Sequence, residues 1–400
     1  MQDSDDQTSG SVAPLYLQYR EFREQAGIHV VAAPGGPRHC LSRYADVAAA
    51  LKDARFGAAP ASPVLLRALR GIGLGGLADV IASGMLVALN PPDHTRLRKV
   101  LDPFFHGKAI ERLKPRVEEI VEDLFHCVEK TGRFDLIADF AAPLPTYIIA
   151  ELFGFSKEEA PRLKQWSHDL APLIDSELQR SSLLRRITAF LAFRRRIKKV
   201  LEERWREPRD DLLSALAQAH HGTGELSQAE AVGTVIFVLI AGHATTTHLI
   251  GSSMQLLLDH PEELSRLRAD PILIDRVLEE ALRMESPIQR TGRVLLEEIE
   301  LHGQRLPRGT KIRLMIGAAN RDPRRFENPD RFDLSRPDNR HVGFGGGIHQ
   351  CIGLHLARLE ARLAIGALLR RFPKLERVSE EMRWVKGTKF RGLAEFAVRV

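Results

Sequence analysis

The spacing of apolar residues predicts a mainly helical protein. Between residues 110 and 130, apolar side chains recur at steps of three and four, as expected for an amphipathic helix. The same pattern predicts helices over residues 143–153 and 183–204, and the second of these has a strongly basic face. These segments are connected by glycine- and proline-rich turns and not by long linkers, so the helices are expected to pack against one another.

Local signals mark the ends of two further helices. Ser227 and Glu230 have the spacing of a capping box, which opens a long helix that continues to about residue 258. A helix over residues 274–285 ends before Pro287, because the residue that precedes a proline avoids the helical conformation. A third helix is expected near residues 45–51, and a last one from about Cys351 to residue 371.

Two regions have the character of strands. Residues 29–33 and 39–41 flank a Pro-Gly-Gly-Pro turn and predict a small hairpin, and residues 292–316 contain short β-like runs. Residues 317–350 are rich in loop-forming residues. The fold class expected from this order of elements is mainly α with small β-sheets.

No boundary between domains is visible along the 400 residues, of which 44% are hydrophobic and 28% charged. Length alone would favour about two or three domains. The chain has no tandem repeat and no Gly/Ser linker, so we predict a disordered tail over residues 1–13 and a single domain over residues 14–400. A domain of that size can enclose both a cofactor and a substrate.

The net charge and the cysteines of the chain indicate which partners and which cellular compartment to expect. The net charge of +6 fits an acidic protein partner, a nucleic acid or simply a solvated basic surface. Cys40, Cys127 and Cys351 are far apart, so a disulfide framework is not expected and a reducing, cytoplasmic environment fits better. The polar N-terminus lacks a signal peptide, and the most apolar run, residues 232–241, is shorter than the roughly 20 residues of a membrane span.

The segment around Cys351 carries the clearest chemical signal. Several glycines lead into this cysteine, and a predicted helix follows it. Glycines let a backbone approach a flat ligand, and a helix N-terminus favours a thiolate. Thiolate is a ligand of haem iron, but a buried structural cysteine, or a zinc site formed with His349 and His355, fits the same residues.

The pattern F-x-x-G-x-H-x-C-x-G over residues 344–353 resembles the haem-binding signature of the cytochrome P450 family at every fixed position. The resemblance runs from about residue 28 to about residue 376 and is closest to the soluble bacterial members. It implies haem b, with Cys351 as the iron ligand, held between the long central helix and the cysteine-bearing helix.

Other segments match the family in the expected order. Glu280 and Arg283 resemble its E-x-x-R motif, whose third partner maps to Arg331 in a structural charge network. From the residues alone, His94 and Arg98 share one face of a predicted helix and fit an anion or a solvated basic turn equally well. By resemblance they contact the haem propionates, together with Arg293 and His349.

The long helix contains Ala241-Gly-His-Ala-Thr245, which resembles the oxygen-binding groove of the family. From the residues alone, small side chains at mid-helix fit a close helix crossing equally well. The resemblance gives Thr245 the role of the catalytic hydroxyl. The family commonly has an acid just before that threonine, whereas this chain has Ala244, so we hypothesise that water or a polar group of the substrate supplies the proton route.

Residues 71–76 fit the G-x-G-x-x-G pattern of dinucleotide sites, but a predicted helix precedes them and no strand ending in an acid follows. We therefore do not interpret them as a nucleotide site. By resemblance they lie in the variable loop over the substrate pocket. The pocket is also expected to include Ala241, Ala244, Ile288, Gln289 and Thr291.

The resemblance implies a monooxygenase that inserts one oxygen atom from O2 into a hydrophobic small molecule, free or carrier-bound, in secondary metabolism or catabolism. No reductase module is visible, so electrons are expected from NAD(P)H through a ferredoxin and a ferredoxin reductase. Candidate docking residues are Arg98, Lys99, Arg358 and Arg362. We expect neither nucleic acid nor a membrane as a partner. Because of Ala244, a haem-based sensor and a peroxide-driven enzyme remain alternative hypotheses.

Overall fold

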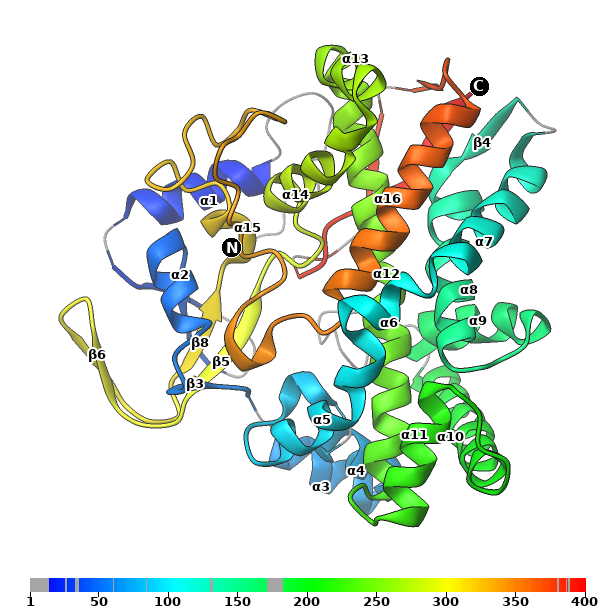
Figure 1. Ribbon diagram of the computed structural model, residues 1–400. Helices are drawn as coiled ribbons and strands as arrows, with labels where there is room; N and C mark the ends of the chain where they lie inside the picture. Colours follow the sequence, from blue (N-terminus) through cyan, green and yellow to red (C-terminus); the bar gives the residue numbers. More distant parts are fainter. Residues whose placement is uncertain are drawn as a thin grey trace.

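A single long helix, α12 (Gln228–Asp259), crosses the whole structure, and most other helices pack around it (Figure 1). The computed structural model describes residues 14–25, 27–32, 36–59, 61–83, 85–129, 132–170, 183–379, 381–385, 387 and 389–400. The tail predicted over residues 1–13 lies outside these ranges, and the division into a tail and a single domain stays a prediction.

The chain is mainly helical, as predicted, with small sheets. The other helices are α1 (Pro14–Glu24), α2 (Tyr44–Ala50), α3 (Pro63–Gly71), α4 (Gly75–Ser83), α5 (Asp93–Phe105), α6 (Gly107–Glu111), α7 (Lys114–Val128), α8 (Pro143–Leu152), α9 (Ala160–Leu170), α10 (Leu183–Arg206), α11 (Leu212–Ala217), α13 (Pro261–Ala269), α14 (Ile274–Met284), α15 (Ile316–Ala319) and α16 (Leu354–Arg371). The strands are β1 (His29–Val31), β2 (Arg38–Leu41), β3 (Phe56–Gly57), β4 (Arg133–Asp135), β5 (Thr291–Leu295), β6 (Ile299–Leu301), β7 (Gln304–Leu306), β8 (Lys311–Leu314), β9 (Glu376–Arg377), β10 (Arg383–Trp384), β11 (Leu393–Glu395) and β12 (Ala397–Arg399).

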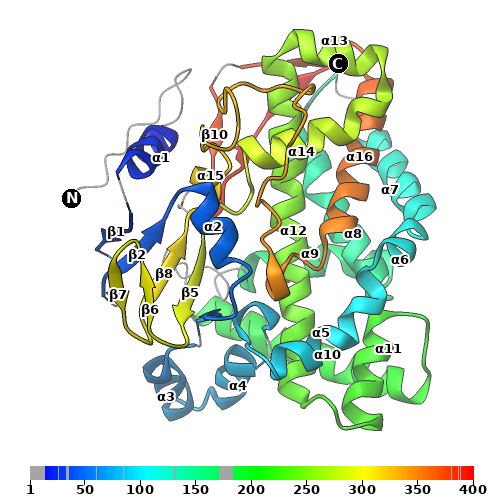
Figure 2. The same ribbon diagram turned by 60° about the vertical axis from the view of Figure 1, so that its left-hand side comes forward.

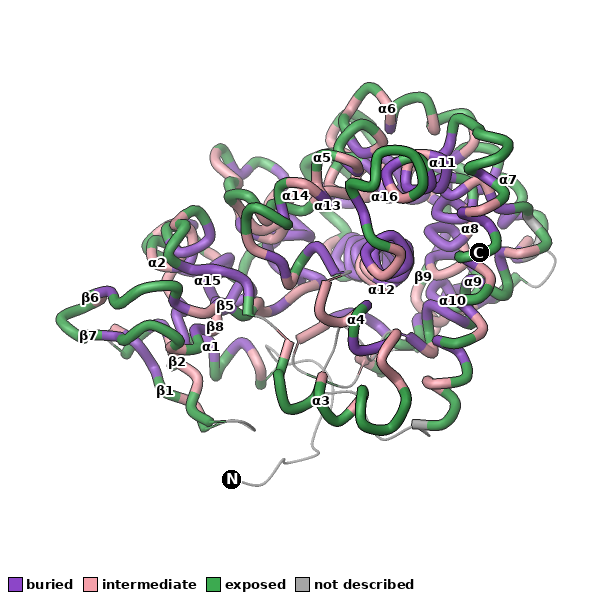
Figure 3. Tube along the Cα trace, turned by 90° about the horizontal axis from the view of Figure 1, so that it is seen from below, coloured by how far each residue is buried: buried purple, intermediate pink, exposed green. Residues whose placement is uncertain are grey.

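The predicted capping box starts α12. The Ser227 hydroxyl accepts the Glu230 backbone N–H at 3.2 Å, and the Glu230 carboxylate accepts the Ser227 N–H at 2.8 Å. By length and composition this helix would cross a membrane, but 67% of its apolar window is buried inside the protein. Seen end-on in Figure 3, α12 lies at the centre of the helical part, so it is a core helix.

The main sheet has five strands in the order β1-β2-β8-β5-β3. The predicted hairpin is confirmed: β1 and β2 pair antiparallel, with His29 opposite Cys40. β2 then pairs parallel with β8, and β5 pairs antiparallel with β8. Figure 2 shows this sheet beside α2 and away from the helices around α12.

Two predicted helix boundaries were wrong. The helix expected over residues 110–130 is interrupted between α6 and α7, because Pro115 lacks a backbone N–H and its ring clashes with the carbonyl of Glu111 in a continuous helix. The last helix begins at Leu354 rather than at Cys351. Cys351 therefore lies in the turn that leads into α16.

A buried charge cluster ties the loop before Cys351 to α14. Glu280 and Arg283 are 1% and 0% exposed, and the guanidinium of Arg283 donates two hydrogen bonds to the Glu280 carboxylate at 2.7 and 2.8 Å. The third side chain is Arg336, whose Nε donates to both oxygens of Glu280 at 3.1 and 3.2 Å. The prediction of Arg331 was wrong: its side chain is exposed, and it contributes only its backbone carbonyl, to Arg283 and Arg336.

Backbone carbonyls complete the charge cluster. Arg283 also donates to the carbonyls of Asn320 and Pro329 at 3.0 and 2.7 Å, and Arg336 donates to the carbonyl of Glu327 at 2.7 Å. The irregular segment after α15 cannot satisfy its carbonyls within regular secondary structure, so the two guanidiniums do so. This arrangement fixes the path of the chain toward Cys351.

We predict that Arg336→Met lowers the free energy of unfolding by about 3–5 kcal/mol, because it leaves the buried Glu280 carboxylate with one cationic partner fewer. The control Arg331→Met keeps the backbone carbonyl and should change stability by less than about 0.5 kcal/mol. Urea unfolding of the two variants checks both values. Equal losses would show that the side chain of Arg336 has no special role.

Another buried acid, Glu360 on α16, has no ion pair within the described part of the chain. The side chain is 2% exposed, and its Oε2 has no hydrogen-bond partner among the described residues. Burial raises the pKa of Glu360 well above the usual value, so the folded protein favours the neutral carboxyl.

The stability of the protein should therefore fall as the pH rises above the unfolded-state pKa of Glu360, since only the unfolded chain ionises freely. We predict that Glu360→Gln becomes increasingly more stable than the wild type between about pH 5 and 8. Urea unfolding at both pH values measures the difference, with Glu262→Gln, at an exposed position, as the control. A difference that does not grow with pH would contradict the neutral carboxyl.

Candidate haem-thiolate site

Cys351 lies between a short 3₁₀ turn (Gly347–His349) and the start of α16, and its side chain is exposed. Its backbone N–H donates to the Phe344 carbonyl at 2.9 Å, which closes the loop. Gly347 has a φ of +63°, and a Cβ there would lie 2.5 Å from the Leu51 carbonyl oxygen. This glycine therefore lets the loop pack against the end of α2.

The surroundings of the Cys351 thiol act on its pKa in opposite directions. Desolvation by the surrounding protein raises the pKa of this otherwise accessible thiol, whereas a hydrogen bond from the Gly353 backbone N–H and the positive charges of Arg98 and Arg358 lower it. These favourable contacts come from the turn at the N-terminus of α16 and from two basic side chains. The site thus has the features that stabilise a thiolate once a cation binds to the sulfur.

Two histidines beside Cys351 have buried ring nitrogens without hydrogen-bond partners among the described residues. His94, on α5, is 2% exposed and neither of its ring nitrogens has a hydrogen-bond partner among the described residues. The Nε2 of His349 is also buried without a partner. The two rings are in edge contact, with their centroids 4.4 Å apart. Buried polar groups without partners are rare and costly, so this pair is prepared for a ligand.

Arg98 and Arg293, the two arginines predicted at the haem site, lie beside these histidines. Burial and the charges of Arg293, His94 and Arg98 lower the pKa of His349 to about 3, which shows that the four groups lie close together. Arg293 is 5% exposed, and its guanidinium donates to the Thr291 hydroxyl and the Gly292 carbonyl. Arg98 donates to the carbonyls that flank His349, those of Ile348 and Gln350, at 3.0 and 2.8 Å.

Within the described part of the chain, His94, His349 and Arg293 have no hydrogen bond to a carboxylate. Such a concentration of donors fits a ligand with two carboxylates, as haem has in its propionates. The zinc alternative is not supported, because no three His, Cys, Asp or Glu side chains among the described residues are placed to hold a metal ion. The residues present therefore fit haem with a cysteine ligand.

The middle of α12 has accessible side chains in an otherwise buried helix. Residues 241–245 are all partly exposed, whereas the residues on either side are mostly buried. The Thr245 hydroxyl donates to the Ala241 carbonyl at 2.6 Å. A Cβ at Gly242 would lie 2.9 Å from the Ile149 side chain, so this glycine permits a close crossing with α8. The small residues thus serve both the helix crossing and an open inner face. Figures 1 and 2 show the loop before α16 (orange) beside the middle of α12.

The predicted pocket residues after α14 divide into two groups. Ile288 and Thr291 are partly exposed. Gln289 is 0% exposed, donates to the Ser286 carbonyl at 2.7 Å and packs against Gly317. The prediction that it lines the pocket was wrong, because its polar group is turned into the core.

The segment over residues 389–392 was missed by the sequence analysis. Ile288 forms an isolated β-bridge with Phe390, and the Gln289 N–H donates to the Lys389 carbonyl at 2.8 Å. Gly392 packs directly against His248 of α12. No motif marks this segment, and only the tertiary structure brings it beside the predicted pocket.

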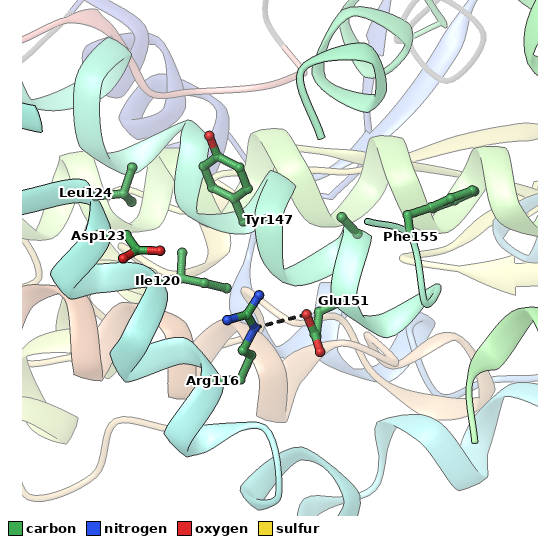
Figure 4. A pocket seen from close by; sticks show the side chains of 8 residues that line it. Arg116, Ile120, Asp123, Leu124, Tyr147, Glu151 and Phe155 are labelled. Carbon is green, nitrogen blue, oxygen red and sulfur yellow. Dashed lines mark hydrogen bonds and ion pairs between the residues drawn. The ribbon is translucent and has the colours of Figure 1, made fainter. Parts of the chain in front are cut away.

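Two cavities of the described structure lie away from Thr245. One, of about 200 Å³, opens between α7 and α8, where Arg116 donates to Glu151 at 3.0 Å (Figure 4). The other, of about 470 Å³, lies between α2 and the outer side of the cysteine loop. Neither is lined by residues of the α12 groove, so they are separate from the candidate site.

An accessible cysteine before a helix, two arginines beside two histidines with unpaired ring nitrogens, and an open stretch of a core helix together define a haem-thiolate protein. The family model for cytochrome P450 matches residues 77–387. The chain belongs to the cytochrome P450 family, and it is therefore a monooxygenase.

Relatives of known function agree over almost the whole chain. The chain is 37% identical to a biotin biosynthesis cytochrome P450 of Bacillus subtilis, over 90% of both proteins. It is 34% identical to the 6-deoxyerythronolide B hydroxylase of Saccharopolyspora erythraea, over 96% of both. The structure superposes with a TM-score of 0.88 on P450BioI, solved in complex with an acyl carrier protein that carries hexadec-9Z-enoic acid. That match has 36% identity and covers 96% of this chain and 98% of the other.

We predict that Arg293→Leu weakens haem retention by about 10- to 100-fold, since a hydrogen bond to a charged group contributes about 1.5–3 kcal/mol. The rate of haem transfer to apomyoglobin measures this loss. Arg308→Leu, at an exposed position, is the matched control and should leave the rate unchanged. Equal rates in the two variants would remove Arg293 from the haem site.

Proposed function

We propose that this P450 monooxygenase uses Cys351 as the iron ligand, with His94, Arg98, Arg293 and His349 holding the propionates of haem b. The observation that carries this proposal is the contact between His94 and His349, whose buried ring nitrogens have no partner among the described residues, beside an accessible cysteine. Bound haem supplies the activation of dioxygen, and one oxygen atom enters the substrate while the other leaves as water. The protein supplies the thiolate, the orientation of the cofactor and the path of the protons.

Thr245 is proposed as the catalytic hydroxyl. Its side chain is partly exposed on the inner face of α12, and its hydroxyl bonds to the Ala241 carbonyl. A hydroxyl held in this way keeps its oxygen free to accept a hydrogen bond from water on the open side. It therefore orients the proton donors without being ionised itself.

The substrate is proposed to be a long hydrophobic molecule of secondary metabolism or catabolism. Ala241, Ala244, Ile288 and Thr291 would provide a small and mostly apolar wall. A carrier-bound acyl chain is the second candidate. It is favoured by the acyl carrier protein in the similar P450BioI structure and by the name of the biotin biosynthesis relative.

Electrons are proposed to come from NAD(P)H through a ferredoxin and its reductase, with the protein in the cytoplasm and without nucleic acid as a partner. Among the predicted docking residues, Lys99 is exposed. Arg358 donates to Glu279 at 2.7 and 2.8 Å, and Arg362 lies 3.6 Å from Asp275. Their charges are largely balanced within the protein, and Arg98 is likewise paired, 3.2 Å from Asp102. Lys99 is therefore the stronger candidate for an acidic partner.

The first experiment is an optical titration of the purified ferric protein with hexadecenoic acid, a macrolide and a steroid. We expect the long acyl chain to shift the Soret band from the low-spin to the high-spin position, because it displaces the water on the iron. A haem-thiolate spectrum that no free compound shifts would favour the carrier-bound substrate or a haem-based sensor. Absence of a haem-thiolate spectrum would overturn the assignment of Cys351.

A further inference from the structure

The residue before Ala244 makes a contact that the sequence does not reveal. The Nδ1 of His243 lies 3.0 Å from the hydroxyl oxygen of Ser167, on α9. Ser167 is 2% exposed, so this pair lies inside the protein. The other ring nitrogen, Nε2, is buried and has no hydrogen-bond partner among the described residues.

Solvent-facing groups lie at the outer end of this pair. His168 follows Ser167 directly, its side chain is 78% exposed, and its Nδ1 lies 3.2 Å from Asp169. Lys164, one turn earlier on α9, is exposed as well. The charges of both Lys164 and His168 act on the pKa of His243. The buried Ser167 hydroxyl therefore contacts the partly exposed His243 and lies on the same helix as these solvent-exposed groups.

At the inner end, helix geometry places Ala244 between His243 and Thr245. Successive residues of an α-helix point about 100° apart, so the His243 and Thr245 side chains cannot touch. The methyl group of Ala244 occupies much less space than an acid would, and residue 244 is partly exposed. A water molecule beside Ala244 would have polar partners on both sides, as a buried water needs.

We infer that Ser167 and His243 carry protons from the solvent, past Ala244, to the water that Thr245 orients, and so replace the acid that this chain lacks. This inference rests on the proposed function of Thr245. In one transfer Nε2–H gives a proton to the water and Nδ1 takes one from the Ser167 hydroxyl, which is reprotonated from the surface. The ring then returns to the Nε2–H form by rotating about its Cβ–Cγ bond, so that a second transfer can follow. The two transfers supply the two protons that, with two electrons from the redox partners, reduce the second oxygen atom of dioxygen to water.

The protonation state of His243 suits this role. Burial lowers its pKa to about 4, and Lys164 and His168 act in the same direction, whereas the Ala142 carbonyl raises it. A neutral imidazole at pH 7 donates from one nitrogen and accepts at the other, as a relay requires. His243 is thus proposed to deliver protons to the reacting atoms through an intervening water molecule and not by direct contact.

The test measures how much of the NADPH consumed appears as hydroxylated product and how much as peroxide, with ferredoxin, its reductase and hexadecenoic acid. His243→Phe and Ser167→Ala should each lower the product fraction by about tenfold. This is less than the roughly 100- to 10,000-fold rate increase that proton transfer by a positioned side chain typically provides. Substrate affinity from the spin-state titration should change less than about twofold. Ser167→Thr keeps the hydroxyl and should retain the wild-type fraction.

Two further variants separate a proton relay from a structural contact. The double variant His243→Phe/Ala244→Glu restores the acid and should recover most of the lost product fraction, which a packing defect would not do. His248→Gln is the matched control, because His248 is also a buried histidine of α12, with a pKa lowered to about 4, and it packs against Gly392. An unchanged product fraction in His243→Phe, or no recovery in the double variant, would overturn the relay.

A spectroscopic measurement tests the pair without turnover. Nitrogen-15 NMR of labelled histidines in the ferrous carbon monoxide form should show His243 neutral at pH 7, with the proton on Nε2. Ser167→Ala should shift the Nδ1 resonance. A protonated ring, or a proton on Nδ1, would contradict the relay even if the enzyme is active. Absence of hydroxylation in the wild type, with these NMR results intact, would instead count against the proposed substrate.

Discussion

The cluster of Arg283 and Arg336 around Glu280 is the interaction on which the cysteine loop depends. The chain over residues 320–346 has no helix or strand that would pair its backbone carbonyls. Its carbonyls receive hydrogen bonds from the two guanidiniums, which are held by the carboxylate of a neighbouring helix. A buried charge of this kind adds little net stability, but removing one partner is costly, so it specifies one conformation of the loop.

Once the loop is held in place, the polar groups at the haem site are left without internal partners. His94 and His349 lie in edge contact, and Arg293 finds only neighbouring oxygens. Such groups cost stability in the protein without cofactor, and their desolvation is compensated when an anionic ligand accepts their hydrogen bonds. The opposite wall, the middle of α12, is kept open by small residues and by a threonine whose hydroxyl bonds to its own helix. The site is thus prepared on both sides before a ligand arrives.

Much of the fold could be predicted because its signals are local. The capping box at Ser227, the helix predicted over residues 183–204 and the pairing of the two strands of the predicted hairpin follow from short-range patterns, and the structure confirms them. The break at Pro115 was missed because apolar periodicity continues through it, although proline chemistry forbids a continuous helix there. Arg331 and Gln289 were assigned wrongly, since sequence position alone does not show whether a side chain or a carbonyl faces a partner.

The amino-acid sequence by itself determined the family, and it predicts the ligand cysteine and four donors for the propionates, because these residues belong to spaced motifs with few alternatives. It also showed that Ala244 stands where an acid is common. Only the tertiary structure decided that Arg336 completes the charge cluster, that residues 389–392 lie beside the pocket, and that Ser167 bonds to His243. These contacts join residues 56, 102 and 76 positions apart, and pairings of that kind depend on how whole elements pack, which no local pattern specifies.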